Sequence, residues 1–191
     1  MGMMINRRRV CGGKSLPYDA EVEYLENVSG GYIIFDLPYF ADYEIDVFVR
    51  RNIANYTLQG NTFSGRQWNL CRNGNAGKWR LRCETQVLDT EIPINIRHKI
   101  KMFQGEVFCD NVKIGEISRN TMTTNSRYTQ LFSSRYAETV VYSLRLYDIN
   151  GVMIVDAIPV RVGQTGYMYD KVSGQLFGNA GTGSFILGPD K

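Results

Sequence analysis

The chain of 191 residues is long enough to enclose one sizeable hydrophobic core, and its 43% hydrophobic and 21% charged residues are ordinary for a globular protein. No apolar run approaches the roughly 18 residues that a membrane-spanning helix needs, which excludes the helical class of membrane proteins. The net charge of +3 is uneven, because residues 1–14 contain four basic residues and no acid, which leaves −1 on the remainder.

The first 19 residues are expected to form a basic arm outside the folded domain. Arg7, Arg8, Arg9 and Lys14 suit contact with an acidic surface of a partner. A solvated, disordered tail is the alternative. The arginines follow only a few apolar residues, which is the wrong order for a secretory signal. We therefore expect the protein to stay inside the cell, or to leave it by lysis or as part of a particle.

Residues 20–191 show β-strand patterns almost throughout. In "YEIDVFV" (43–49) apolar residues alternate with Glu44, Asp46 and Phe48. The stretch "INIRHKIKM" (94–102) places one histidine among four apolar residues on a single face: Ile94, Ile96, His98, Ile100 and Met102. Three further runs are rich in β-branched and aromatic residues and are predicted strands: "GYIIFDL" (31–37), "VVYSLRLYDI" (140–149) and "VMIVDAIPV" (152–160).

Turn signals separate these strands. Asn150-Gly151 suits the tight turn of a hairpin, and Asp110-Asn111 is interpreted in the same way. No amphipathic helix is evident beyond a turn or two near residues 119–126. Many short strands without helices predict two packed antiparallel sheets, in a sandwich or jelly roll that forms a single domain over residues 20–191.

The glycine-rich segment "DKVSGQLFGNAGTGSF" (170–185) raises the question of a phosphate-binding loop. It lacks the lysine of G-x-x-x-x-G-K-[ST] and leads into a strand-like run rather than a helix, and the spacing G-x-G-x-x-G is also missing. We interpret these glycines as turn residues. Four apolar residues are expected to pack this segment onto the sandwich: Leu176, Phe177, Phe185 and Leu187.

Both ends of the domain resemble a known family. "VYSLRLYDINGVMIVD" (141–156) and "IPVRVGQTGYMYDKVSGQLFGNAGTGSFILGP" (158–189) resemble the C-terminal signature of laminin-G-like, concanavalin A-like jelly-roll proteins, which are common in gut Bacteroides-type bacteria and their phages. "LPYDAEVEYLENVSGGYIIFDL" (16–37) resembles the first strands of that family. There an E-Y-L-E start usually precedes Y-I-D-T-G, whereas this chain has Ile34-Phe35-Asp36 in place of D-T-G.

The resemblance implies a concanavalin A-like jelly roll and, by association, a non-enzymatic structural protein of a phage particle, in the tail or on the capsid surface. Its partners would be other virion proteins and further copies of itself in a homo-oligomer. Its location would be the virion, assembled in the host cytoplasm. The alternative location is the bacterial cytoplasm, or release by lysis.

Enzymatic patterns are incomplete, and no catalytic residue is predicted. Laminarinase-type hydrolases of this fold carry E-x-D-x-E or E-x-D-x-x-E on one strand, but "EIDVF" has Phe48 and Val49 where the second glutamate belongs. His98 is the only histidine and is better explained as a hydrogen-bonded core residue. No serine or cysteine has a nucleophile-elbow context. No cofactor and no metal are expected, since the cysteines lack zinc spacing and no loop resembles D-x-D-x-D.

A carbohydrate-binding, lectin-like module for bacterial surface polysaccharide is the alternative function. Its tentative site is Arg66, Trp68, Asn69 and Trp79, in which indoles would stack on sugars and polar groups would bond hydroxyls. The same side chains could bind single-stranded nucleic acid, which is the less favoured interpretation. Tryptophans of β-sandwiches mostly fill the core or a subunit contact, and this explanation is preferred over both.

Cysteine pairing stays open at this point. The chain has four cysteines, for which buried free thiols are the expected state, although Cys71 and Cys83 could face each other across two strands.

Overall fold

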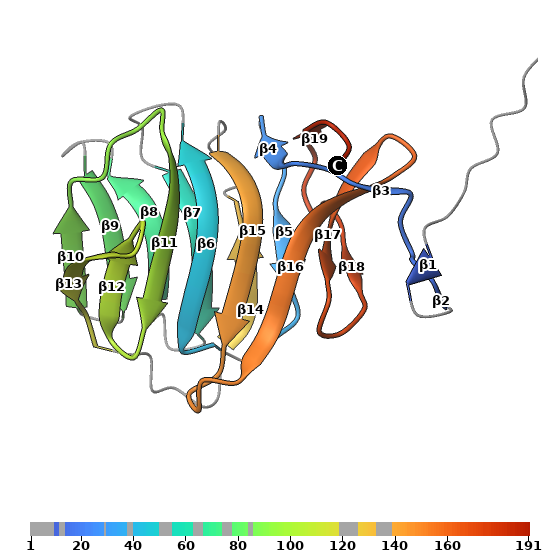
Figure 1. Ribbon diagram of the computed structural model, residues 1–191. Helices are drawn as coiled ribbons and strands as arrows, with labels where there is room; N and C mark the ends of the chain where they lie inside the picture. The colour runs from blue at the N-terminus through green and yellow to red at the C-terminus, as the bar shows by residue number, and fades with distance from the viewer. Residues whose placement is uncertain are drawn as a thin grey trace, which may run out of the picture.

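The computed structural model describes residues 10–11, 14–28, 30–37, 40–49, 55–62, 67–73, 78–83, 86–118, 126–132 and 139–191. These residues form strands and turns without a helix, and every strand pairing is antiparallel. Two sheets lie face to face as the layers of a sandwich of the jelly-roll type (Figure 1). The predicted fold class is therefore confirmed. The predicted helical turn near residues 119–126 lies almost wholly outside the described residues.

The larger sheet has eleven strands, with the central order β13-β12-β11-β6-β15-β16-β17-β18. Off this path, β3 pairs with β16, β4 pairs with β15, and β19 pairs with β4. Its strands are β3 (Ala20–Glu21), β4 (Leu25–Asn27), β6 (Asp42–Val49), β11 (Arg97–Phe103), β12 (Glu106–Cys109), β13 (Val112–Glu116), β15 (Thr139–Tyr147), β16 (Met153–Val162), β17 (Thr165–Asp170), β18 (Leu176–Phe177) and β19 (Phe185–Leu187).

The smaller sheet has six strands in the order β10-β9-β8-β7-β14-β5. They are β5 (Ile33–Phe35), β7 (Asn55–Thr62), β8 (Gln67–Asn73), β9 (Lys78–Cys83), β10 (Gln86–Thr90) and β14 (Ser126–Leu131). In the arm, β1 (Val10–Cys11) and β2 (Lys14–Ser15) pair with each other and with no other described strand. Among the described residues, none belongs to a helix that could cross a lipid bilayer.

The core lies between the two sheets. Strand β6 shows the predicted alternation, because Tyr43, Ile45, Val47 and Val49 are buried while the residues between them are only partly covered. Opposing apolar side chains come from the smaller sheet, among them Phe35, Leu58, Leu70, Trp79 and Leu81. Each large apolar side chain removed from water contributes about 1.5–3 kcal/mol, so this shared interior holds the two sheets together.

The predicted hairpin turns are present. Asp110 and Asn111 have φ values of 51° and 67°, the left-handed pair typical of a type I′ turn between β12 and β13. Gly151 has φ 79° in the connection from β15 to β16, where Asp148 Oδ1 accepts hydrogen bonds from the backbone N–H groups of Asn150 and Val152. Turn chemistry visible in the sequence therefore sets the ends of these strands.

Two details differ from expectation. Strand β11 begins at Arg97 rather than Ile94, because Asn95 takes a left-handed backbone (φ 59°) that breaks the alternation and leaves Ile96 53% exposed. Cys71 and Cys83 do not face each other, since the register of β8 and β9 pairs Cys71 with Arg80 and Cys83 with Trp68.

The glycine-rich segment is structural, as predicted. Gly181 lies so close to Gly30 that a Cβ on it would overlap the Gly30 carbonyl oxygen, so only glycine fits. The four apolar residues expected to anchor this segment all pack against buried clusters: Phe177, Phe185 and Leu187 against the main core, and Leu176 against the small cluster around Tyr18.

The first and last residues of the body are joined by backbone pairing. Strand β4 pairs with both β15 and β19, and Val22 forms an isolated bridge with Asp190. Arg161 binds the Asp190 carboxylate through two nitrogens, at 2.7 and 2.5 Å. Packing against the sandwich begins at Leu16, before the predicted boundary at residue 20, because Leu16 and Tyr18 contact Ile158 and Val160.

Candidate functional site

A histidine, a cysteine and an aspartate meet at one end of the β11–β12 hairpin. His98 Nδ1 lies 2.7 Å from Asp110 Oδ2 and 3.6 Å from Cys109 Sγ, and Sγ lies 3.7 Å from the same Oδ2. His98 is only 7% exposed, Cys109 is partly buried, and the Asp110 side chain is 52% exposed. The cluster therefore extends from the edge of the core to the surface. The expectation that His98 is a hydrogen-bonded core residue is confirmed.

The hairpin register brings these three residues together. Ile100 pairs with Cys109, so Cys109 is the diagonal neighbour of His98 on the same face of the sheet. Asp110 follows as the first residue of the I′ turn, and its Oδ1 accepts a hydrogen bond of 2.8 Å from the backbone N–H of Lys99. The second ring nitrogen of His98, Nε2, lies 3.1 Å from the carbonyl oxygen of Pro93. Every polar atom of the cluster thus has a defined neighbour.

The arrangement is not that of a catalytic cysteine. In a cysteine–histidine–carboxylate triad the thiol and the carboxylate bind different ring nitrogens, whereas here both lie at Nδ1 and Nε2 faces a backbone carbonyl. Burial, together with the charge of Asp110 and a hydrogen bond to it, raises the pKa of the Cys109 thiol to about 11. A nucleophilic cysteine needs the opposite shift.

The charge of the aspartate is maintained by its partners. Partial burial opposes ionisation of Asp110, but the hydrogen bonds from the Lys99 backbone and from His98 outweigh it, so the pKa of this carboxyl lies below its usual value. Both neighbours of the His98 ring, Oδ2 of Asp110 and the Pro93 carbonyl, are acceptors, and a ring that bonds both must carry two N–H groups.

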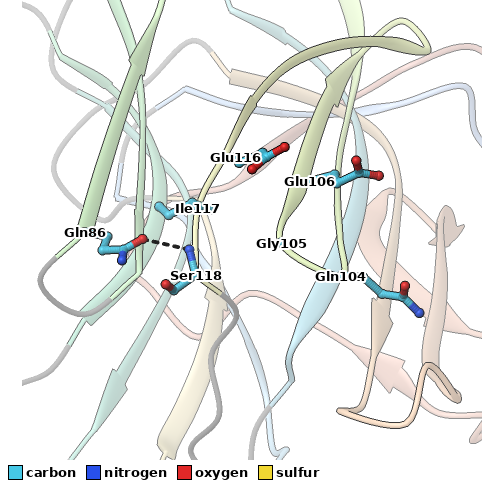
Figure 2. A pocket seen from close by; sticks show the side chains of 7 residues that line it. All are labelled: Gln86, Gln104, Gly105, Glu106, Glu116, Ile117 and Ser118. Carbon is cyan, nitrogen blue, oxygen red and sulfur yellow. Dashed lines mark hydrogen bonds between the residues drawn. The ribbon is translucent and has the colours of Figure 1, made fainter.

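A polar pocket of about 750 Å³ opens between β10 and the β12–β13 hairpin. Its lining is Gln86, Gln104, Gly105, Glu106, Glu116, Ile117 and Ser118. Figure 2 shows Gln86 facing Ser118, whose backbone N–H donates to Gln86 Oε1 at 2.8 Å, while Glu106 and Glu116 project from the neighbouring hairpin. Amides and carboxylates of this kind can bond hydroxyl groups of a ligand.

The two glutamates of the pocket share one lysine. Glu106 pairs directly with Glu116 across the hairpin, and Lys113 Nζ lies 2.7 and 2.5 Å from their carboxylates. The hydrogen bond from Lys113 lowers the pKa of Glu116 below its usual value. Retaining glycoside hydrolysis needs one of two carboxyl groups to stay protonated as the general acid. A lysine that favours the ionised form of Glu116 works against that role for this residue.

The "EIDVF" stretch forms the polar outer face of β6, as interpreted from the sequence. Glu44 and Asp46 bind arginines of the neighbouring strands: Arg145 lies 3.1 Å from Glu44, and Arg97 lies 2.7 Å from Asp46. The Arg97 guanidinium also lies over the Tyr142 ring, 3.7 Å from its centroid. These carboxylates are engaged in cross-strand ion pairs on the sheet surface, which is a structural use of the motif.

The tentative glycan site is not assembled as a surface by the residues that the structure describes. Trp79 is 1% exposed and Asn69 is 5% exposed, so neither side chain offers a face to a sugar. Trp79 pairs with Arg72 and Trp68 with Cys83, so the two tryptophans stand at opposite ends of the β8–β9 pairing. Arg66 and the side chain of Trp68 lie outside the described part of the chain.

The arm residues are only partly described. Lys14 begins β2, and its side chain is not among those described; Arg7, Arg8 and Arg9 precede the first described residue.

Sequence analysis missed the cluster of His98, Cys109 and Asp110. No linear spacing of histidine and cysteine marks it, because the residues come from two strands of a hairpin. The available signal was the Gln104-Gly105 turn, which pairs Phe103 with Glu106 and thereby fixes Ile100 opposite Cys109. A search for ligand-type side chains across each predicted hairpin would have found it.

No protein-family model matches the chain, and no curated protein is significantly similar to it.

Proposed function

We propose that this protein is a non-enzymatic structural component of a phage particle, in the tail or on the capsid surface. The observation that carries the proposal is the relation of the arm to the body. β1 and β2 pair with no other described strand (Figure 1). Tyr18, shortly after β2, is buried against Ile158 and Val160. The chain that follows the basic residues is thereby anchored at Tyr18 on a nearly neutral body.

The resemblance of residues 16–37 and 141–189 to jelly-roll proteins of Bacteroides-type phages supports the same function. Arms that leave a rigid body at a fixed point suit repeated contacts between neighbouring subunits, so we expect a homo-oligomer or a repeated position in the virion. The basic side chains of the arm would meet an acidic surface of the neighbour. Assembly would take place in the host cytoplasm.

The first experiment is mass spectrometry of density-purified particles from a culture that carries the gene. We expect the peptide "LFGNAGTGSFILGPDK" (176–191) at about tens of copies per particle or more, because a subunit of a symmetric assembly is present in many copies. Its absence from particles, together with its abundance in cells or medium, would overturn the proposal.

A second experiment tests the arm. Deletion of residues 1–15 should leave a folded body, because packing on the sandwich begins at Leu16. We expect the truncated protein to stay soluble and to lose assembly. The matched control replaces Arg7, Arg8 and Arg9 by lysine, which keeps the charge and should preserve assembly if electrostatics dominate. Normal assembly of the truncated protein would contradict the role of the arm.

A carbohydrate-binding module is the second candidate, and the polar pocket favours it. Gln86, Gln104 and Glu106 offer amide and carboxylate groups in an open hollow large enough for a sugar unit. Saturable binding on an array of bacterial polysaccharides would support this function, provided that Gln104→Ala weakens it. The comparison variant is Trp68→Ala. If only that variant loses binding, the site lies near β8 instead.

A further inference from the structure

We propose that His98, Cys109 and Asp110 form a binding site for a divalent transition metal ion, with Zn²⁺ as the best match. The site is independent of the proposed virion function. Three side chains that each offer one ligand atom converge here, and all their ligand atoms lie within 4.8 Å of one another. In the described part of the chain this is the one group of that kind.

Two of the three distances between the ligand atoms already match those around a tetrahedral zinc ion. With ordinary zinc–ligand bonds, sulfur lies about 3.6 Å from nitrogen and from oxygen, and nitrogen lies about 3.4 Å from oxygen. Cys109 Sγ is already 3.6 Å from His98 Nδ1 and 3.7 Å from Asp110 Oδ2. Only the hydrogen bond of 2.7 Å between Nδ1 and Oδ2 has to open, by about 0.7 Å. The Asp110 side chain is half exposed, and a small rotation that keeps Oδ1 on the Lys99 N–H would move Oδ2 by that amount.

The groups behind the ligands orient them as in known metal sites. A metal-bound histidine usually donates its other N–H to a backbone carbonyl or a carboxylate, which fixes the tautomer. His98 Nε2 faces the Pro93 carbonyl at 3.1 Å, and this contact directs Nδ1 toward the thiol. The backbone N–H of Lys99 similarly holds Asp110 Oδ1, which leaves Oδ2 directed at the same point.

The chemistry of the ligands selects the metal. One nitrogen, one thiolate sulfur and one carboxylate oxygen suit Zn²⁺ or Co²⁺, whereas Ca²⁺ and Mg²⁺ require oxygen ligands. Binding releases the thiol proton of Cys109 and the proton between His98 and Asp110, since metal ligands bind in their deprotonated forms. Because Asp110 lies at the surface, the fourth position of the tetrahedron faces solvent and is filled by water. Bound metal would tie the β12–β13 turn to the start of β11.

The test uses the full-length, metal-free protein and Co²⁺ as a spectroscopic probe. We expect one equivalent to produce thiolate-to-cobalt charge-transfer absorption together with the visible bands of a tetrahedral ion. Zn²⁺ should displace the cobalt and raise the thermal midpoint by about 5 °C or more when it is present far above its dissociation constant. Cys109→Ser should abolish the charge-transfer band, and Asp110→Asn should weaken binding at least about tenfold.

Two matched controls separate the site from the other thiols and carboxylates. Cys83→Ala removes the buried thiol of β9, and Asp89→Asn removes an exposed carboxylate of β10; both should bind Co²⁺ like the unmodified chain. The proposal is overturned if no one-equivalent band forms, if the band survives in Cys109→Ser, or if Zn²⁺ stabilises that variant as much as the original. Asp110→Asn changes a half-exposed side chain, so it tests the site even if a cysteine variant folds poorly.

Discussion

A Cβ atom at Gly181 would lie 1.9 Å from the carbonyl oxygen of Gly30, so the glycine-rich segment and the start of β5 are in direct backbone contact. The backbone N–H of Thr182 donates to the same carbonyl at 3.1 Å, and that of Ala180 donates to the Tyr32 carbonyl at 2.8 Å. Main-chain bonds therefore hold the segment against the residues that lead into β5.

Gly181→Ala should destabilise the fold by about 1–3 kcal/mol or more, because backbone and not a flexible side chain occupies the space of the new methyl group. The free energy of unfolding from denaturant titration measures this effect. Ala180→Ser, at the exposed neighbouring position, serves as the control and should change stability by less than about 0.5 kcal/mol. Equal stability of the two variants would show that the backbone around Gly30 and Gly181 adjusts to the methyl group without loss of folding free energy.

Trp79→Ala should cost about 3–5 kcal/mol of stability, since it empties a fully buried position in the core. Trp79→Phe should cost less, because it keeps most of the apolar volume and the indole Nε1 finds no hydrogen-bond partner in the described structure. Circular dichroism during urea unfolding provides the measurement. If Trp79→Ala is instead as stable as the parent chain but loses glycan binding, the tryptophan acts at a surface.

Alkylation of Cys109 should be slow at neutral pH and should rise about tenfold per pH unit until pH is near 11, because only the thiolate reacts. The raised thiol pKa favours the protonated form in the folded state. Its contribution to stability is therefore complete below the ordinary cysteine pKa of 9.0 and disappears as pH rises through about 11. Peptide mass spectrometry after timed labelling in a chelator gives the rate. A profile with a midpoint near 8 would contradict the environment described.

The Arg97–Asp46 pair should show a coupling free energy of about 0.2–1 kcal/mol in a double-mutant cycle, as exposed ion pairs do. Its two-nitrogen geometry, at 2.7 and 2.8 Å, favours the upper end of that range. Arg97→Ala, Asp46→Asn and the double variant would be compared by urea unfolding at low salt and at roughly 1 M salt, where screening is strong. A coupling that does not fall with salt would point to packing of Arg97 on Tyr142 instead.

The fold class could be predicted from the sequence because the local residue patterns agree with the tertiary packing. The alternation in residues 43–49 matches the burial of β6, Asp110-Asn111 forms the type I′ turn that its residue types favour, and Gly151 takes a left-handed backbone in the connection predicted at Asn150-Gly151. The start of β11 was predicted wrongly, since one left-handed residue, Asn95, breaks a pattern that looks continuous in the letters.

The candidate sites were harder to predict from the sequence, because each depends on the strand register or on which face of the sheet a side chain occupies. For Trp79 the sequence favoured the core or a subunit contact over a ligand platform, and its burial among residues of both sheets decides for the core. His98 was correctly placed in the interior, but its partners Cys109 and Asp110 follow from a hairpin register that a weak Gln104-Gly105 turn sets. The spacing of residues along the sequence does not show which of them become diagonal neighbours across a hairpin.

The place of β4 between β15 and β19 governs when the protein can fold. On the ribosome, residues 25–27 emerge early but have no strand partners until residues 139–141 and 185–187 follow. Pairing so distant along the chain slows folding and leaves apolar strands uncovered in the meantime. Closure of the larger sheet therefore has to wait until residues 185–187 have left the ribosome, and nascent chains stalled before residue 185 should stay sensitive to protease and available to chaperones.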